Sequence, residues 1–479
     1  MTFSIALRIG RATSFGTDAL ACGPFTSAFG DNATAVGQNA VAANENNIAI
    51  GNTAIAAFNN AISIGANSQA NGVDAVALGG GVSEDGSRAG AQALGNSTTA
   101  IGGESIAEGA GTTAIGWRSE ATAERAQAFG HLATAQGERS LAVGENADAQ
   151  TDFSTAIGNE SIANGTDALA IGDTANANGN STTAVGGESV ATGAGATAIG
   201  WQSSATGAQA QAFGHQATAT GDLSLAIGED SQALSANSTA IGNLSTATGV
   251  DALALGDTAN ANGNSTTAVG GESIANGAGA TAIGWQSTAS AERAQAFGHL
   301  ASATGVRSTA VGEAAAAGGL NSIAIGNQSS AANDNQIALG GAGQLQASTA
   351  SQTGSTNIVT TDANGTLGTS VSVTSLATVN QLANTNMQVS DLRSQYNRQE
   401  ERLDEAEDGI AMALALETPV IPSGKRYAMT IGTGYYNGGS ALSTSFASRL
   451  SDTMSISAGA GVGLDTGKVG ARGGVTFAW

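Results

Sequence analysis

The apolar positions in the first 340 residues follow a 14-residue period. From Ala100–Gly102 to Ala338–Gly340, a triad of Ala, a large apolar residue and Gly recurs over 17 intervals of 14 residues. A further Ala stands five residues after each repeat Gly as far as Gly326, and a second, less regular Gly comes seven residues after it. The period continues upstream to Gly37 and slips at an insertion around residues 80–90. A fixed period of this kind predicts a repeat architecture.

The length of the repeat selects the type of fold. Fourteen residues are too few for a pair of helices, and two glycines per unit disfavour helix. Two short strands joined by tight turns fit the length, which predicts a parallel β-solenoid in which each 14-mer is one rung. The repeat glycines are expected to supply positive-φ turn residues; the first five in strict phase are Gly102, Gly116, Gly130, Gly144 and Gly158.

Alternation along a strand sends the two apolar residues of each triad to opposite faces. We expect the large residue to fill the coil, because its burial is worth about 1.5–3 kcal/mol. The Ala would then form a flat outer face that packs against a neighbouring chain. The alternative is that Ala only fits a narrow turn.

A longer period of 84 residues, or six rungs, is superimposed on the first. Trp117, Trp201 and Trp285 follow it, and each stands directly after a repeat Gly. The three histidines, His131, His215 and His299, take the same position one rung later. Residues after a turn Gly are expected to be exposed, so the tryptophans are candidate adhesive contacts, with partial packing against a neighbouring rung or chain as the alternative. Histidines six rungs apart lie too far from one another for a shared metal site.

Composition narrows the function. Gly accounts for 69 of 479 residues and Pro for only 3, which excludes a collagen helix. The formal net charge of −22 disfavours nucleic acid as a partner. The single cysteine, Cys22, excludes an intrachain disulfide framework. No nucleophile–base pair or nucleotide-binding loop is evident, so neither an enzyme nor a cofactor or metal is expected. Residues 1–16 lack the pattern of a secretory signal.

The last third of the chain changes character. Residues 341–374 are rich in Gly, Ser, Thr and Asn, and we expect a neck or connector. Residues 375–418 carry apolar residues seven apart, which predicts a coiled-coil stalk; the predicted core is Leu382, Val389, Tyr396, Leu403 and Ile410. Because a coiled coil cannot bury its seam alone, the chain is expected to be an oligomer.

Residues 419–479 contain four segments of strand period, each about 10 residues long, the length of a strand that crosses a bilayer. Four strands cannot close a barrel, whereas three chains would supply twelve. We therefore predict a trimeric barrel anchor with its glycine face directed inward toward the stalk helices. A soluble sandwich is the alternative.

The whole chain resembles the YadA-like trimeric autotransporter adhesins. Ser154–Gly158 is similar to that family's head repeat, Glu407–Leu416 to the helix that enters its anchor, and Arg449–Asp452 to the anchor itself. The resemblance implies a trimeric β-roll head, a stalk and a twelve-stranded barrel in the outer membrane of a Gram-negative bacterium. It also implies that the barrel helps to export the head, with the terminal Phe477 and Trp479 as part of the signal for the barrel-assembly machinery.

These expectations give an all-β chain with a short stalk that acts as a surface adhesin. Its ligand would be a matrix protein, a glycan or another cell-surface molecule, bound multivalently. The alternatives are a passive surface spacer and a solenoid that binds ice or polysaccharide. The last is prompted by the Thr pairs that begin at Thr98, Thr182 and Thr266, but these recur only every sixth rung.

Overall fold

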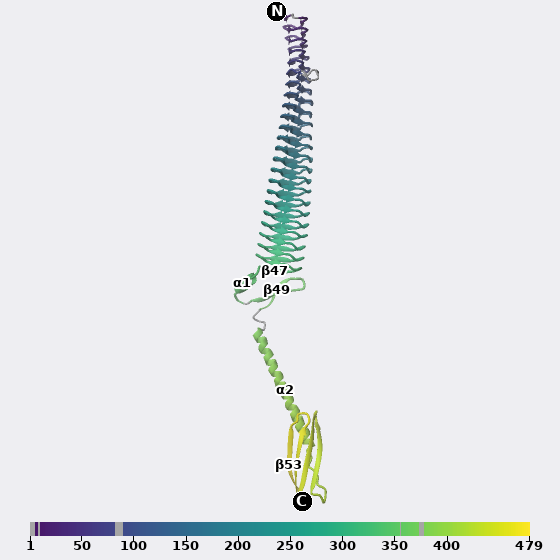
Figure 1. Ribbon diagram of the computed structural model, residues 1–479, viewed down its shortest axis with the longest axis vertical. Coiled ribbons are helices and arrows are strands. Elements are labelled where there is room, and N and C mark those ends of the chain that lie inside the picture. The colour runs from purple at the N-terminus through teal and green to yellow at the C-terminus, as the bar shows by residue number, and fades with distance from the viewer. Residues whose placement is uncertain (1–4, 8–9, 82–89, 355, 373–377) are drawn as a thin grey trace. The chain divides into compact units, whose positions relative to one another are not determined.

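The computed structural model describes residues 5–7, 10–81, 90–354, 356–372 and 378–479. The chain forms two compact units, residues 1–350 and residues 351–479 (Figure 1). The first unit is mainly the repeat region, called the head below. The second contains a hairpin, one long helix and four C-terminal strands.

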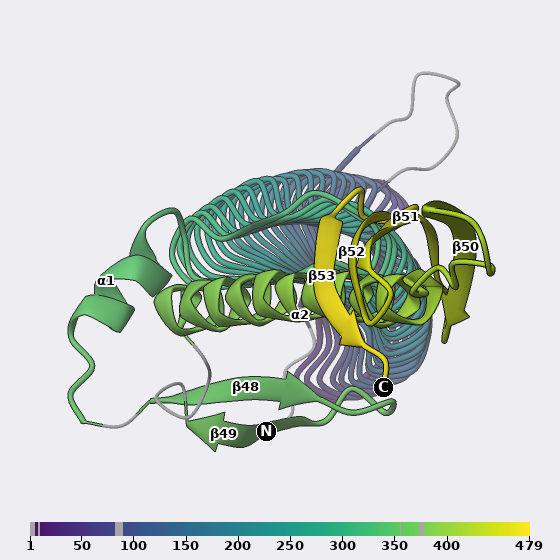
Figure 2. The same ribbon diagram turned by 90° about the horizontal axis from the view of Figure 1, so that it is seen from below.

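The head is the predicted parallel β-solenoid, which is thereby confirmed. Three-residue strands, the odd-numbered series from β1 (Ile5–Leu7) to β47 (Ile337–Leu339), form a 24-stranded sheet. Two-residue strands, the even-numbered series from β2 (Thr13–Ser14) to β46 (Ser330–Ala331), form a second sheet. Figure 2, which looks along the stack, shows the rungs following one another closely.

Each rung pairs with the next in the register set by the repeat. In β13 (Thr99–Ile101) and β15 (Thr113–Ile115), Ala100 lies beside Ala114. Across the insertion, β11 (Val76–Leu78) pairs directly with β13, so the stack continues without a break. Part of the insertion, residues 82–89, lies outside the described residues, as do residues 1–4 and 8–9 of the N-terminal segment.

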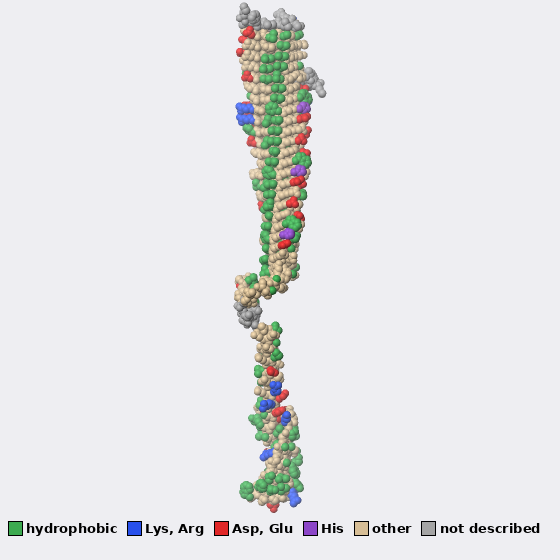
Figure 3. All heavy atoms as spheres, turned by 90° about the vertical axis from the view of Figure 1, so that its left-hand side faces the viewer, with side chains coloured by type: hydrophobic (Ala, Val, Ile, Leu, Met, Phe, Trp, Pro, Cys, Tyr) green, Lys and Arg blue, Asp and Glu red, His purple; other side chains and the backbone are tan. Residues whose placement is uncertain are grey.

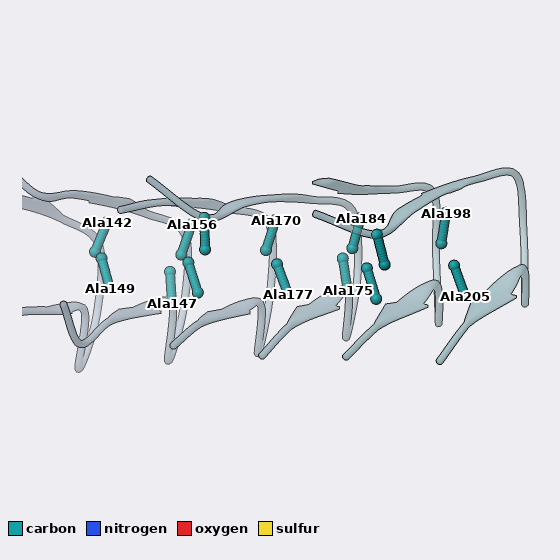
Figure 4. Packing of buried hydrophobic residues seen from close by; sticks show 14 of the residues in the cluster. Ala142, Ala147, Ala149, Ala156, Ala170, Ala175, Ala177, Ala184, Ala198 and Ala205 are labelled. Carbon is teal, nitrogen blue, oxygen red and sulfur yellow. The ribbon is translucent and has the colours of Figure 1, made fainter. Parts of the chain in front are cut away.

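The predicted orientation of the triad is wrong. In β21 (Thr155–Ile157), Ala156 is fully buried, whereas Ile157 lies on the outer surface and is partly exposed. The buried residues of the head are nearly all Ala, Ser or Thr, and Figure 4 shows Ala methyl groups from the two sheets pointing toward each other. Two strands closed by two tight turns leave a narrow interior that holds mainly methyl and hydroxyl groups. The largest fully buried side chain among the described residues is Asn47, whose amide bonds to the backbone of Ala56 and Ala61. This narrow interior, and not a core of one large side chain per rung, accounts for the few aromatic residues.

Most inward hydroxyl groups are satisfied locally. The buried hydroxyls without a partner among the described residues of the head belong to Ser140, Ser224, Ser273, Ser308, Ser322, Ser329 and Thr151. Thr98 Oγ1 donates to the carbonyl of Gly95 at 2.7 Å, and Ser105 Oγ donates to that of Gly102 at 2.9 Å. The same three-residue bond recurs along the head, so a Ser or Thr at these inward positions leaves no unmet polar group in most rungs.

The repeat glycines adopt the predicted positive φ. Gly144 has φ +137°, and a Cβ there would lie 2.3 Å from the carbonyl oxygen of Gly158 on the next rung. The second Gly of each unit is required for a different reason. Gly137 needs no positive φ, but a Cβ would overlap the backbone of Thr151. In most turns the left-handed φ near 60° falls on a non-glycine residue such as Glu104, and Gly takes that position at Gly111, Gly195 and Gly279.

The connector has more structure than its composition suggested. After the last rung comes a short helix, α1 (Gln344–Ala350), in the first unit. The second unit begins with an antiparallel hairpin, β48 (Asn357–Thr361) and β49 (Leu367–Ser372). Asp362 Oδ1 closes the hairpin turn by accepting from the N–H groups of Asn364 and Thr366. Residues 355 and 373–377 are not among the described residues.

The stalk segment is a single helix, α2 (Val379–Ala415), which begins in a capping box formed by Thr378 and Gln381. Four antiparallel strands follow in sequence order and form one sheet. They are β50 (Tyr427–Tyr436), β51 (Gly439–Ser451), β52 (Met454–Gly463) and β53 (Val469–Phe477).

Candidate adhesive face and membrane anchor

The outer face of the odd-numbered sheet carries a continuous row of large apolar side chains, which we call the apolar stripe. It consists of the residue before each repeat Gly, from Ile101 to Leu339. Ile115, Ile199 and Ile325 are 36–44% exposed in one chain, and Figure 3 shows a hydrophobic stripe down one face of the head. The equivalent face of the even-numbered sheet is mixed, with Glu120, Asp148 and several Thr. An exposed apolar surface of this length is typical of an interface between chains.

The tryptophans and histidines lie together in a ladder on the turn that follows the stripe. Trp117 stacks on His131 with ring centres 4.9 Å apart and planes 17° apart. Trp201 with His215 and Trp285 with His299 repeat this at 4.8 and 4.9 Å. Figure 3 shows the His side chains (purple) one below another along one edge of the head. Each Trp is 43–47% exposed, as expected.

Each histidine is also held from its other side. His131 Nδ1 lies 3.2 Å from Glu145 Oε1 on the following rung, and the equivalent pairs with Glu229 and Glu313 measure 3.4 and 3.5 Å. A metal role is not supported by any cluster, since the described residues contain no group of three or more His, Cys, Asp or Glu side chains able to hold an ion. The histidine instead links an aromatic ring to a carboxylate.

The position directly after the repeat Gly, called the turn column below, has the same order in every six-rung block. The order is Gly, Trp, His, Glu, Asn and Asp, one residue per rung, and the third block ends at Asn327. Asn159 Nδ2 donates to Asp173 Oδ1 at 2.9 Å, and Asn243 donates to Asp257 at 3.0 Å. The order of this ladder is visible in the sequence when residues 14 apart are compared, whereas the contacts between its side chains are visible only in the structure.

The predicted coiled-coil core lies on α2 with its side chains in solvent. Leu382, Val389, Tyr396, Leu403 and Ile410 are 42–64% exposed in one chain. Apart from Asp408, the charged residues of α2 remain at its surface, and the buried residues are confined to its C-terminal end. The seam thus has no partner within a single chain.

The end of α2 packs against a glycine-lined face of the four strands. A Cβ at Gly434 would lie 2.0 Å from the carbonyl oxygen of Ala411, and one at Gly432 would lie 2.1 Å from that of Ala415. Glycine is therefore required for the helix to approach the sheet so closely. The glycine face that the sequence predicted lies against the helix, while its direction inside a trimeric barrel stays a prediction.

Polar side chains of the strands hold the helix in this position. Ser443 Oγ donates to the carbonyl of Ala415 at 2.6 Å, and Arg472 Nη1 donates to that of Leu416 at 2.9 Å. Both satisfy carbonyls that a helix C-terminus leaves free. The buried Asp408 accepts from the hydroxyl and the N–H of Thr466, both at 2.7 Å. These bonds fix the helix axially as well as laterally.

The opposite face of the strands is apolar and exposed. Met429, Ile431 and Phe446 are 49–70% exposed, and Tyr427 stacks on Phe446 with ring centres 5.7 Å apart. The predicted terminal signal residues are exposed too, Phe477 at 63% and Trp479 fully. Within the part of the chain that the structure describes, no helix is both long and apolar enough to cross a membrane.

Comparison with family models decides the identity. The YadA head domain repeat matches residues 16–54, 59–81, 93–119, 121–161, 163–245, 247–273 and 275–341, and the YadA-like membrane anchor domain matches residues 419–479. The chain belongs to the YadA-like trimeric autotransporter adhesins. The anchor of this adhesin places it in the outer membrane with the head exposed on the surface. Both models describe parts of adhesins and not enzymes.

Several solved chains are similar to this YadA-like chain, and one of them comes from Yersinia. It is the crystal structure of the collagen-binding domain of the Yersinia adhesin YadA, with 24% sequence identity over 47% of this chain and 86% of that one, at a TM-score of 0.16. Comparison with curated proteins found no significant match.

Proposed function

We propose that three copies of this chain join through the apolar stripe and the seam of α2. The stripe runs over 17 rung intervals, or about 80 Å at a spacing near 4.8 Å. Its side chains are already half covered, so burying the remainder contributes about 1 kcal/mol for each of them. The mixed outer face of the even-numbered sheet, with Glu120 and Asp148 among its side chains, leaves the odd-numbered sheet as the surface that association covers.

In the same trimer, twelve strands would form a closed barrel with the three helix ends inside it. Two observations support this: the close approach of α2 to the glycine face and the apolar opposite face. Closure would also pair the outer edges of β50 and β53, which lipid does not tolerate unpaired. Export of the head through this barrel and recognition of Phe477 and Trp479 by the barrel-assembly machinery belong to the same proposal. In this proposal the head ends at residue 340, the connector at residue 374 and the stalk at residue 418.

The function that the head supports best is attachment to a substratum, host matrix or another cell. The observation that carries it is the turn column, because a half-exposed Trp braced by His and Glu occurs three times at a fixed spacing. Aromatic side chains held rigidly at a surface are favourable binding contacts, and repetition adds multivalency. A passive spacer would need no such repeated exposed aromatic group.

Deletion in register tests the adhesive function. Removal of residues 159–242 takes out six whole rungs and one Trp–His pair, and it joins Gly158 to Asn243 in the original phase. We expect cells that display the shortened chain to attach more weakly to matrix-coated surfaces, at equal surface levels measured by antibody labelling. Full attachment after this deletion and after removal of the other two blocks would establish the passive spacer instead.

A further inference from the structure

The first of the three blocks contains an internal cation on its tryptophan. The guanidinium carbon of Arg118 lies 4.5 Å from the ring centre of Trp117, and its Nε lies 2.6 Å from Glu104 Oε2. Glu104 is on the rung before Trp117, whereas His131 stacks from the rung after it. The guanidinium therefore lies on the ring face opposite the histidine, between an aromatic face and a carboxylate. This is a complete cation site, filled by the chain itself.

The second and third blocks have the same site without the cation. Gln202 and Gln286 replace Arg118, and each donates its neutral amide to a carboxylate at 2.7 Å, Glu188 and Glu272 respectively. Among the described residues no ion pair neutralises either glutamate. The acidic side of the site is thus retained where its positive partner is missing.

These two blocks also carry one additional carboxylate. Two rungs before Trp201 the turn column has Asp173, where the first block has Gly80. Between them, Gly187 leaves the ring uncovered from that side: a Cβ there would lie 3.1 Å from Trp201 Cδ1 and 3.8 Å from the carbonyl oxygen of Asp173. Gly271, between Asp257 and Trp285, repeats this geometry at 3.1 and 3.7 Å.

We propose that Trp201 and Trp285 each bind a guanidinium or ammonium group from a basic segment of a partner polypeptide. This rests on the proposed adhesive function and names the chemical class of its ligand. The indole face attracts the cation, and Glu188 or Glu272 supplies the opposite charge. Asp173 and Asp257, whose carboxylates accept from Asn159 and Asn243, add negative potential from two rungs away. Arg118 shows how the cation sits. The net charge of −22 steers basic ligands toward the head.

The site stays accessible in a trimer because of what surrounds it. The turn column carries a Glu or Asp in two of every six rungs, and burying them against another acidic chain would be costly. Association through the apolar stripe leaves this turn in water.

The spacing defines the ligand further. Trp201 and Trp285 are six rungs apart, about 29 Å at the rung spacing. An extended peptide covers that distance in about nine residues. A segment with two basic residues nine apart can occupy both sites of one chain, and its second contact is intramolecular.

The test measures binding of a labelled peptide, with two Arg nine residues apart in a Gly/Ser background, to the full-length trimer in detergent. Gln202→Arg and Gln286→Arg fill the two sites in the manner of the first block. The matched control is Gln209→Arg, which adds the same charge on the opposite turn, where the other blocks have Arg125 and Arg293. We expect each filled site to weaken binding roughly two- to thirty-fold, with Gln209→Arg close to the parent, and Arg118→Gln to strengthen binding.

The proposal is overturned if Gln202→Arg with Gln286→Arg binds the peptide as Gln209→Arg does. It is also overturned if a neutral oligosaccharide binds in a manner lost in Trp201→Leu, while the Arg peptide does not, since the ring would then be a sugar platform. Neither result depends on cell attachment. If deletion of rungs abolishes attachment while the peptide fails to bind, the adhesive function is supported and the cation site is rejected. If the peptide binds while deletion of rungs leaves attachment unchanged, only the adhesive function is rejected.

Discussion

Replacing Ala156 by Leu tests the finding that the narrow interior of the head admits only small side chains. Ala156 is fully buried in β21, between Ala142 and Ala170 on the neighbouring rungs. Leu adds three carbon atoms where a closed 14-residue coil has little freedom to widen. Overpacking of a tight core costs about 1–3 kcal/mol, and we expect the upper half of that range. The control is Ile157→Leu, which places the same side chain on the outer face of the same strand.

Hydrogen exchange of the full-length trimer provides the measurement. A cost of about 2–3 kcal/mol raises local opening roughly 30- to 150-fold, so amides in the rungs around Ala156 should exchange faster by that factor. Ile157→Leu should leave them within a few-fold of the parent. If Ala156→Leu leaves exchange of these rungs unchanged but alters the association of chains, Ala faces a neighbour and the interior assignment is wrong.

Three further substitutions probe the turns, the stalk and the anchor. Gly144→Ala places a Cβ 2.3 Å from the carbonyl oxygen of Gly158 at a residue whose φ is +137°. It should lower the melting temperature of the head, measured by circular dichroism. An unchanged melting temperature would show that the turn can relax. Ile410→Asp puts a charge in the seam of α2 and should abolish trimers on a non-denaturing gel. Intact trimers would show that Ile410 is not part of the seam. Gly434→Val should prevent α2 from reaching the strands, because its Cβ would lie 2.0 Å from the carbonyl of Ala411. A trimer closed by the proposed barrel is expected to stay intact on heating in detergent, and Gly434→Val should lose this resistance, while the neighbouring Thr433→Val on the other face should keep it. Retention in both would show that the glycine face is not needed.

The architecture could be predicted from the sequence because its signals are periodic. The 14-residue spacing of repeat glycines determined the rungs, and the alternation in β50 to β53 located all four C-terminal strands. The glycine face could also be predicted, since Gly432 and Gly434 alternate with large residues. The hairpin in the connector could not be predicted in this way, because the polar composition hid the β-branched run Ile358–Thr361 in the strand Asn357–Thr361.

The direction of the triad could not be obtained from periodicity. Alternation shows that Ala156 and Ile157 face opposite ways, but both are apolar, and the larger one gains more from burial. The deciding quantity is the space inside the coil, which depends on two turns that bring the sheets close together. The candidate site could be predicted only in part for a related reason. Trp201, His215 and Gly187 can each be read from the sequence, but their contacts depend on how successive rungs pair.

The hydrogen bonds between rungs have a mechanical consequence. They run along the stacking direction, so tension applied along the head pulls on one ladder at a time and not on all of them together. A rung that detaches releases 14 residues, which change from about 5 Å of stack to nearly 50 Å of extended chain. Because each rung contacts only its neighbours, the remainder keeps its structure. Under load each detached rung would lengthen about tenfold and add about 45 Å to the head, dissipating energy before the anchor has to bear the full force.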